Sequence, residues 1–255
     1  MKSLTEKKQK EHYNQFFDKE FVRNHQNKGS SILKEELVNN YYKKYSKNYK
    51  DVCEIGCGIG SLSHQLKPHY KTFLGIDISD KALNLARKLH GSKKIKFINT
   101  NLCTKKSIMN NKFDTIILNG SLHHMPLTKT FFYNINRISK KDATFIFVEP
   151  HNKNFLINLL RNIRKKIDKT YTEDQVFFDP EIFKKTLNKN GLNGTVFVGQ
   201  KFGDTVCNSL TIIWNSIQNN AFKEIVAVLV FIKKYLKIKE TSMLTLLNRQ
   251  NKPIS

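Results

Sequence analysis

The chain of 255 residues is 39% hydrophobic and 25% charged, a composition typical of a globular protein with one domain plus insertions or a small cap. Its formal net charge of +23, from 44 Lys and Arg against 21 Asp and Glu, favours contact with nucleic acid, an anionic membrane or an acidic substrate. The lysines are dispersed and asparagine recurs along the chain, so a purely compositional origin of the charge is the favoured alternative.

The cysteines and the N-terminal residues bear on the cellular compartment. Cys53, Cys57, Cys103 and Cys207 form no CxxC pair and no zinc-ligand spacing, so we expect reduced thiols and no metal site. Residues 1–15 are polar and charged, which argues against a signal peptide, and no stretch has the roughly 18 apolar residues of a membrane span. The expected location is the cytoplasm, with peripheral membrane contact as an open alternative.

Two helices are predicted before the first strand. Tyr13 and Phe17 lie four residues apart within 4–25, which places them on one face of a helix. Residues 30–46 have the pattern of a second helix. We therefore expect an N-terminal helical cap over residues 1–48.

Alternating strands and helices are predicted from there to residue 148. The strands are short apolar runs, at 52–55, 72–76, 95–98, 113–118 and 143–148. The helices between them span 61–66, 80–90 and 128–139. Such alternation predicts βαβ units, and right-handed crossovers arrange them as an α/β, doubly wound sheet with helices on both faces. Ligands of these sheets bind outside the carboxyl ends of the strands.

Beyond residue 150 the predicted order is looser. A helix is expected from Pro180, capped by Asp179, to Gly191. Further helices are predicted at 154–167, 207–219 and 221–238, and short strands at 195–198 and 241–247. The prediction is thus a Rossmann-like, mostly parallel seven-stranded sheet in a domain over 49–255, with a C-terminal helical insert at about 205–239.

The first strand runs into a glycine-rich loop, Glu54-Ile55-Gly56-Cys57-Gly58-Ile59-Gly60, which opens a helix. Glycines at such a turn let the backbone bend tightly and approach a ligand closely. The dinucleotide fingerprint is Gly-x-Gly-x-x-Gly, whereas the third glycine here comes early, at Gly60. Glu54 would also repel a pyrophosphate, but it suits a ligand that carries an ammonium and a sulfonium.

The second strand ends at Asp77, about 20 residues after the glycine loop. A carboxylate at this place can accept hydrogen bonds from both hydroxyls of a ribose, and Ile78 would then lie against adenine. The alternative role of Asp77 is to cap the next helix, although Ser79 or Asp80 can do so instead.

Together, the segments Glu54-x-Gly-x-Gly-x-Gly and Gly75-Ile76-Asp77 resemble the class I S-adenosylmethionine-dependent methyltransferases. Four further segments resemble the same family: Phe97 to Leu102, Lys112 to Asn119, Leu122-His123-His124-Met125 and Phe147-Val148-Glu149-Pro150. The resemblance covers residues 50 to 150 and is specific as a set. It is greatest to the small-molecule branch that includes quinone and polyketide-sugar methyltransferases.

The resemblance implies S-adenosylmethionine as cofactor and S-adenosylhomocysteine as product. The residues that it places at the cofactor are Glu54, Gly56, Cys57, Gly58, Gly60, Asp77, Ile78, Asn101, Leu102, Asn119 and His124. Asn101 stands where the family more often has Asp, and its amide carbonyl could accept from the adenine amino group in the same way. The segment 139–143 replaces the usual Lys-Pro-Gly-Gly turn, at a distance from the cofactor.

Transfer of a sulfonium methyl group is an in-line displacement, so the protein mainly aligns the donor with its acceptor. A hydroxyl or amine acceptor can need a general base, for which His123 and His151 are the catalytic candidates. His124 is expected to pack beneath the cleft, and a structural role is the alternative for each histidine. Tyr13 and Phe17 are predicted either to cover the cofactor as a lid or to dock the N-terminal helix.

Three functions remain open. The first is methylation of a small molecule, including a lipid-linked or cell-surface glycan precursor, because segments 154–167 and 222–239 are basic and amphipathic and could lie on an anionic membrane. Core-facing helices with solvated lysines are the favoured alternative for both segments. The second is RNA methylation, suggested by the charge alone, since the sequence has no Asn-Pro-Pro-Tyr motif or RNA-binding appendage. The third is a non-catalytic binding module.

Overall fold

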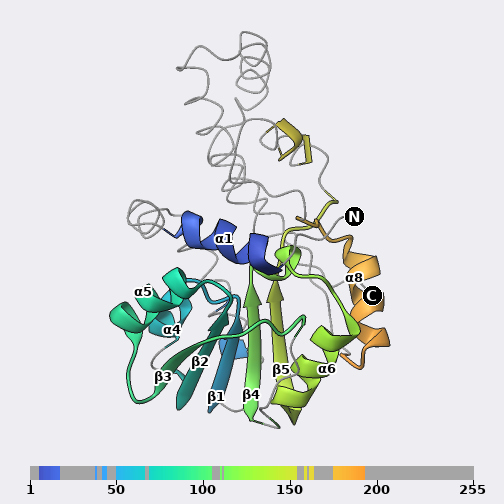
Figure 1. Cartoon of the computed structure of the whole chain (residues 1–255). Helices are drawn as coiled ribbons and strands as arrows, with labels where there is room; N and C mark the ends of the chain where they lie inside the picture. The colour runs from blue at the N-terminus through green and yellow to red at the C-terminus, as the bar shows by residue number, and fades with distance from the viewer. Residues whose placement is uncertain are drawn as a thin grey trace, which may run out of the picture. The chain divides into compact units, whose positions relative to one another are not determined.

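The computed structural model describes residues 6–17, 38, 42–44, 50–66, 69–104, 110, 112–153, 158–159, 161–163 and 175–192 (Figure 1). The chain divides into two compact units. The first unit comprises residues 1–150 and 174–176, and the second comprises 151–173 and 177–255. The sheet and the predicted cofactor loop belong to the first unit.

The first unit is built on a parallel sheet whose strands follow the predicted order along the chain. Its strands are β1 (Asp51–Ile55), β2 (Thr72–Asp77), β3 (Ile95–Asn99), β4 (Phe113–Asn119) and β5 (Ser139–Val148). They lie in the order β3-β2-β1-β4-β5, and every neighbouring pair is parallel. The strand order reverses between β1 and β4, so their carboxyl ends flank the crevice where open α/β sheets bind ligands.

The central strands β1 and β4 form because their side chains are buried on both faces of the sheet. In β1 every residue from Val52 to Ile55 is buried, and β4 is buried at Phe113 and from Thr115 to Leu118. Continuous apolar runs of this kind are typical of parallel strands covered by helices on both sides. Burial of each large side chain contributes about 1.5–3 kcal/mol to folding.

The helices of the first unit connect these strands. After β1 comes α4 (Ser61–Gln65), after β2 comes α5 (Asp80–His90), and β4 leads through the 3-10 turn η2 (Leu122–His124) into α6 (Lys129–Ile138). The chain steps from β1 to β3 in one direction and from β4 to β5 in the other. Right-handed crossovers therefore place α4 and α5 on one face of the sheet and α6 on the opposite face.

Side-chain caps fix where two of these helices start. The hydroxyl of Ser79 accepts a hydrogen bond from Ala82 N–H at the start of α5, and that of Thr128 accepts from Phe131 N–H at the start of α6. Such caps satisfy backbone donors that have no partner within the helix. Because Ser79 provides the cap, the side chain of Asp77 is available for other contacts.

Helix α1 (Glu6–Phe16) lies across the carboxyl ends of the strands, as Figure 1 shows. It is attached to the start of α5, where Lys10 forms an ion pair with Asp80 and Asn14 Oδ1 accepts from the Ser79 hydroxyl. The predicted helix that carries Tyr13 is therefore α1, which lies over the ligand crevice. In the predicted second helix, 30–46, the structure describes only residues 38 and 42–44, which are helical.

The second unit contains α8 (Pro180–Lys189), which begins as predicted. Asp179 caps this helix by accepting hydrogen bonds from two backbone N–H groups of its first turn, and Pro180 fills its first position. Asp179 also forms an ion pair with Lys153. A short parallel bridge joins His151 to Phe178.

One predicted boundary is wrong, because β5 begins at Ser139 and not at Ala143. Ser139 pairs with Phe113 across an irregularity in the β4–β5 register. Lys140 then places its ammonium between Asp51 and Asp114, at 3.2 and 2.9 Å, which ties the new strand to β1 and β4. The segment that was predicted to be a turn is therefore part of the sheet.

The structure confirms five strands of the predicted sheet with helices on both faces. The predicted strands at 195–198 and 241–247, the helices at 207–219 and 221–238, and the insert at 205–239 lie outside the described residues. The domain boundary at residue 48 stays a prediction. In the described part of the chain, no helix combines the length and apolar character that crossing a membrane requires.

Candidate active site

The glycine loop after β1 takes a conformation that other residues rarely adopt. Gly56, Gly58 and Gly60 have φ angles of 74°, 50° and 77°, in the left-handed region. A Cβ on Gly56 would stand 2.3 Å from Cβ of Ser121, the residue just before η2. The hydroxyl of Ser121 donates to Ile55 O at 2.7 Å. The loop and the turn after β4 are thus in direct contact.

Two further predicted residues of this loop are buried. Glu54 lies within β1, between Gly75 of β2 and Ile117 of β4, and is only 4% exposed. Cys57 packs into the core beneath Gly75, while its backbone N–H donates to Ile76 O. Burial, and next the charge of Asp77, raises the pKa of the Cys57 thiol, which is therefore neutral. The Cys57 side chain is a packing group, so any ligand contact there would come from its backbone.

Asp77 joins the end of β2 to the glycine loop. Its Oδ2 accepts from Gly58 N–H at 2.8 Å and its Oδ1 accepts from Ser79 N–H at 2.9 Å. Burial raises the pKa of Asp77, and the hydrogen bonds from Ser79, Gly58 and Ile78 oppose that rise. An ionised carboxylate has about four lone-pair sites, so after these three backbone hydrogen bonds Asp77 can still accept from a ligand donor such as a hydroxyl.

The loop after β3 is held by its own side chains. Asn101 is 8% exposed, and its Oδ1 accepts from Cys103 N–H at 2.9 Å. Leu102 is also buried, and its carbonyl accepts from Asn134 Nδ2 of α6 at 2.7 Å. The amide oxygen that we expected to meet adenine therefore has a local partner already, with one lone pair left. A contact of Asn101 or Leu102 with a cofactor stays a prediction.

Asn119 ends β4 at the point where the strand order reverses. Among the described residues, its Oδ1 is buried without any hydrogen-bond partner. A buried polar oxygen left in this state costs about 1–3 kcal/mol. A ligand donor, such as an ammonium group, would remove that cost. The structure therefore offers an acceptor at the place where the sequence predicts a ligand.

Glu149, which directly follows β5, holds the η2 turn. Its Oε1 accepts from Ser121 N–H at 3.0 Å and from Leu122 N–H at 2.8 Å. Its Oε2 accepts from His123 N–H at 3.3 Å and lies 2.8 Å from His123 Nδ1. The sequence placed Glu149 near the crevice but gave it no role. The signal that could have revealed its role is the Leu-His-His turn together with the Glu-Pro pair at the end of the fifth strand.

The neighbouring His124 has different surroundings. Burial, followed by the nearby His123 and His12, lowers the pKa of His124 to about 3, so its ring is neutral. Its ring makes an edge contact with Tyr13 of α1, with centroids 5.6 Å apart, and its carbonyl accepts from Gln9 Nε2. These contacts favour the packing role that the sequence suggested, although His124 was also placed among the cofactor residues.

The two predicted lid residues lie at the loop and the turn. A Cβ on Gly58 would stand 3.2 Å from the ring of Phe17, so this ring covers the middle of the glycine loop. Tyr13 lies against His124, as described above. His151 belongs to the second unit, where its Nδ1 accepts from Lys153 N–H. Its catalytic role stays a prediction.

Comparison with known proteins identifies the family. A model of the methyltransferase domain family matches residues 46–191, more than half of the chain. The chain is 30% identical over 136 residues to CRG1 of Saccharomyces cerevisiae, a probable S-adenosylmethionine-dependent methyltransferase, with 52% of this chain and 46% of the relative covered. It is 26% identical over 111 residues to an uncharacterized methyltransferase of Mycobacterium tuberculosis, with 42% and 56% covered. The chain thus spans about half the length of these curated relatives.

Solved structures share the fold. An S-adenosylmethionine-dependent methyltransferase of Leishmania major superposes with a TM-score of 0.58 at 15% identity, over 75% of this chain and 76% of that chain. The YcgJ protein of Bacillus subtilis superposes with a TM-score of 0.54, also at 15% identity, over 76% and 86%. At such identity the likeness shows the fold alone, whereas the family model matches the sequence itself. The chain therefore belongs to the class I S-adenosylmethionine-dependent methyltransferases.

Proposed function

We propose that this chain binds S-adenosylmethionine at the carboxyl ends of β1, β2 and β4 and catalyses methyl transfer to a small-molecule acceptor. The observation that carries the proposal is the 2.8 Å hydrogen bond from Gly58 N–H to Asp77 Oδ2. This hydrogen bond holds the Asp77 carboxylate next to the glycine loop. The Asp77 side chain and the loop backbone can therefore contact the same ligand. A ribose hydroxyl fits the acceptor capacity that remains on the carboxylate.

The charge distribution of the crevice supports a cationic ligand. Glu54 and the unpartnered Oδ1 of Asn119 lie on neighbouring strands beside the glycine loop. The cofactor carries an ammonium and supplies an activated methyl group on a positively charged sulfur. In a site with little water, acceptor oxygens attract such a cation more strongly than they would in solvent.

The remaining roles follow from position. We assign the backbone of Gly56 and Gly60 to close approach, Ile78 to one face of adenine, and Tyr13 and Phe17 to a cover that excludes water. His123 is assigned to take the proton of a hydroxyl or amine acceptor. Asn101, Leu102, His124 and the backbone of Cys57 complete the predicted cofactor set.

A lipid-linked or cell-surface glycan precursor is our finer proposal for the acceptor. It rests on the basic amphipathic segments at 154–167 and 222–239, which lie largely outside the described residues. Cosedimentation with anionic liposomes would support it, whereas an RNA gel shift at physiological salt would favour RNA as the acceptor.

Calorimetric titration with S-adenosylhomocysteine tests the cofactor assignment. We expect a low-micromolar dissociation constant, about −8 kcal/mol. Asp77→Ala removes the charged acceptor of the ribose, a hydrogen bond worth about 1.5–3 kcal/mol, and also the acceptor of Gly58 N–H in the glycine loop, so it should weaken binding by about 100-fold. The matched control is Asp142→Ala, an exposed carboxylate near the amino end of β5, which should bind like the wild type. A folded wild-type chain that does not bind in the millimolar range would sink the proposal.

A further inference from the structure

Two adjacent histidines lie on the η2 turn, and the structure distinguishes them. The ring of His124 is desolvated, and its Nδ1 is buried without a hydrogen-bond partner among the described residues. Proton transfer to this ring would create a buried, uncompensated charge. The ring of His123, only 4.0 Å away between centroids, instead has a carboxylate at its Nδ1. Of the two rings, only that of His123 has a partner that can stabilise its protonated form.

The carboxylate of Glu149 is itself fixed in place. Its side chain is 5% exposed, and it accepts hydrogen bonds from the backbone N–H groups of Ser121, Leu122 and His123. The backbone of His123 is held from its other side as well, because its carbonyl accepts from Val176 N–H at 2.9 Å. Neither partner of the 2.8 Å contact between Glu149 Oε2 and His123 Nδ1 can move freely. The pair is therefore preorganised in the folded chain.

An ionised carboxylate only accepts hydrogen bonds, so the Nδ1 that faces it must carry the proton. In the neutral ring the Nε2 atom then keeps its lone pair. Free imidazole side chains in water favour the opposite tautomer, with the proton on Nε2. Glu149 thus selects the less common tautomer of His123, the one that leaves Nε2 able to accept a proton.

The pair also lies at the place where the cofactor is proposed to bind. His123 follows the end of β4 after three residues, and β4 flanks the point where the strand order reverses. Ser121, at the head of the same turn, donates to Ile55 O and contacts the glycine loop at Gly56. The side chain of His123 is 13% exposed, so it is not sealed in the core.

We infer that Glu149 is a positioning residue, which holds His123 in the tautomer whose Nε2 takes the proton of the methyl acceptor. This inference rests on the proposed function. The acceptor heteroatom forms its bond to the methyl carbon as the carbon–sulfur bond breaks, and the electron pair of that bond stays on sulfur. The acceptor proton moves to Nε2, the resulting imidazolium is neutralised by Glu149, and the proton then passes to solvent.

Nitrogen NMR of histidine-labelled, full-length protein tests the inference without any acceptor. The titratable groups around His123 are Glu149 at the end of β5, His124 beside it and, from α1, His12 and Tyr13 through their contacts with His124. Spectra are recorded at alkaline pH, on the neutral form of the ring. The wild type should show His123 with its proton on Nδ1. The amide of Glu149→Gln has only one oxygen, which the N–H groups of Ser121 and Leu122 occupy. Its NH₂ group would then face His123 Nδ1 and donate to it, so the ring proton should move to Nε2.

The exposed Glu181→Gln on α8 is the matched control and should leave the His123 spectrum unchanged. Glu149→Asp keeps the negative charge, so it should retain most of the Nδ1–H form; it also serves if Glu149→Gln does not fold. An Nε2–H form in the wild type, or an unchanged tautomer in Glu149→Gln, would overturn the inference. Titration with S-adenosylhomocysteine is run beside each variant, because loss of binding by the wild type would count against the proposed function and not against the tautomer.

Discussion

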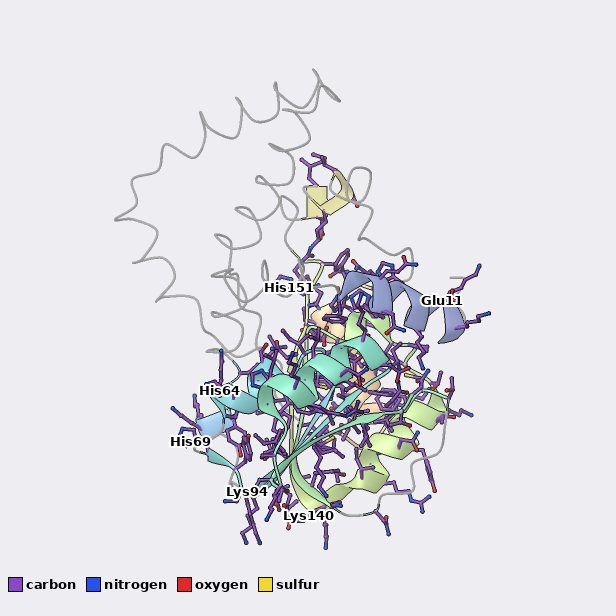
Figure 2. All side chains as sticks on the ribbon, turned by 60° about the vertical axis from the view of Figure 1, so that its left-hand side comes forward. Glu11, His64, His69, Lys94, Lys140 and His151 are labelled. Carbon is purple, nitrogen blue, oxygen red and sulfur yellow. The ribbon has the colours of Figure 1, made fainter. Side chains whose placement is uncertain are left out.

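The two edges of the sheet use carboxylates in opposite ways. At the carboxyl edge, Asp77 and Glu149 accept hydrogen bonds from backbone N–H groups of the loops around the crevice. At the amino edge, Asp51 and Asp114 instead share the ammonium of Lys140. Figure 2 shows Lys140 at the end of the sheet that lies away from α1, the helix that bears Glu11.

The amino edge also carries a group of exposed lysines. Because all five strands are parallel, the residues that precede them meet at one edge. Exposed lysines stand before or at the start of every strand: Lys50, Lys71, Lys93, Lys94, Lys112 and Lys141. Figure 2 shows both Lys94, before β3, and Lys140, on β5, at this end of the sheet. Solvated lysines of this kind favour solubility and add little to stability.

The two edges should therefore respond differently to substitution. A buried carboxylate that holds a loop determines the shape of a site, and its loss leaves backbone donors without partners. The partly buried carboxylates of the amino edge instead share a lysine whose side chain is 37% exposed, and water weakens such ion pairs. We therefore expect substitutions at the carboxyl edge to affect ligand binding, and substitutions at the amino edge to change stability slightly.

The largest effect is expected from Gly56→Ala. A residue with a Cβ at φ 74° costs about 1–2 kcal/mol, and the new Cβ would stand 2.3 Å from Ser121 Cβ, forcing the loop and the η2 turn apart. We expect a loss of about 2–4 kcal/mol in the free energy of unfolding. Binding of S-adenosylhomocysteine should weaken by more than about 100-fold, equivalent to about 2.7 kcal/mol. Chemical denaturation and calorimetry measure the two effects.

Gly191→Ala is the matched control for that experiment. Gly191 also has a left-handed φ, of 81°, but a Cβ there would meet nothing within 4 Å. Only the backbone strain of about 1–2 kcal/mol should remain, with binding unchanged. If Gly56→Ala bound the ligand as tightly as Gly191→Ala, the contact between the loop and the turn would have no part in the site.

A smaller effect is expected from pH, through Asp77. Its pKa in the folded chain is raised above the ordinary value of 3.8, so the native state binds this proton more readily than the unfolded state does. The contribution of Asp77 to stability therefore decreases as the pH rises through the raised pKa. Ribose hydroxyls need the ionised acceptor, so the affinity for S-adenosylhomocysteine should instead decrease as the pH falls through that pKa.

Calorimetry between about pH 7 and pH 4 measures this loss. Asp77→Asn cannot ionise, so it should bind S-adenosylhomocysteine more weakly than the wild type at neutral pH. Its affinity should then decrease less than that of the wild type as the pH falls. Equal pH dependence in the two proteins would show that another group controls binding, and would remove Asp77 from the ribose assignment.

Much of the fold could be predicted from the sequence because its signals are local. The apolar runs of β1 and β4 mark strands buried on both faces, and the glycines after β1 mark a turn that only they tolerate easily. The placement of Asp77 follows from the same reasoning, since it ends a strand next to that turn. Each of these predictions needed only residues that are close together along the chain.

The predictions that failed or stayed incomplete depend on contacts between distant residues. The start of β5 depends on Lys140 meeting Asp51, which is 89 residues away in the sequence. The role of Glu149 depends on a turn 26 to 28 residues earlier. The sequence suggested a catalytic role for His123 and a packing role for His124, but the carboxylate that orients His123 lies 26 residues away in the sequence. Local patterns carry no information about such pairings.

The smallest effect is expected from Lys140→Met at the amino edge. Asp114, and then Asp51, raises the pKa of Lys140, so the lysine is charged and paired at neutral pH, but its side chain is 37% exposed. Exposed ion pairs contribute about 0–1 kcal/mol each, and methionine keeps the apolar part of the side chain. We expect a loss of about 1 kcal/mol or less by chemical denaturation, which should shrink further in high salt. Binding of S-adenosylhomocysteine should be unchanged. A loss of binding comparable to that of Gly56→Ala would mean that the two edges are coupled through the sheet, and would contradict the separation of roles argued above.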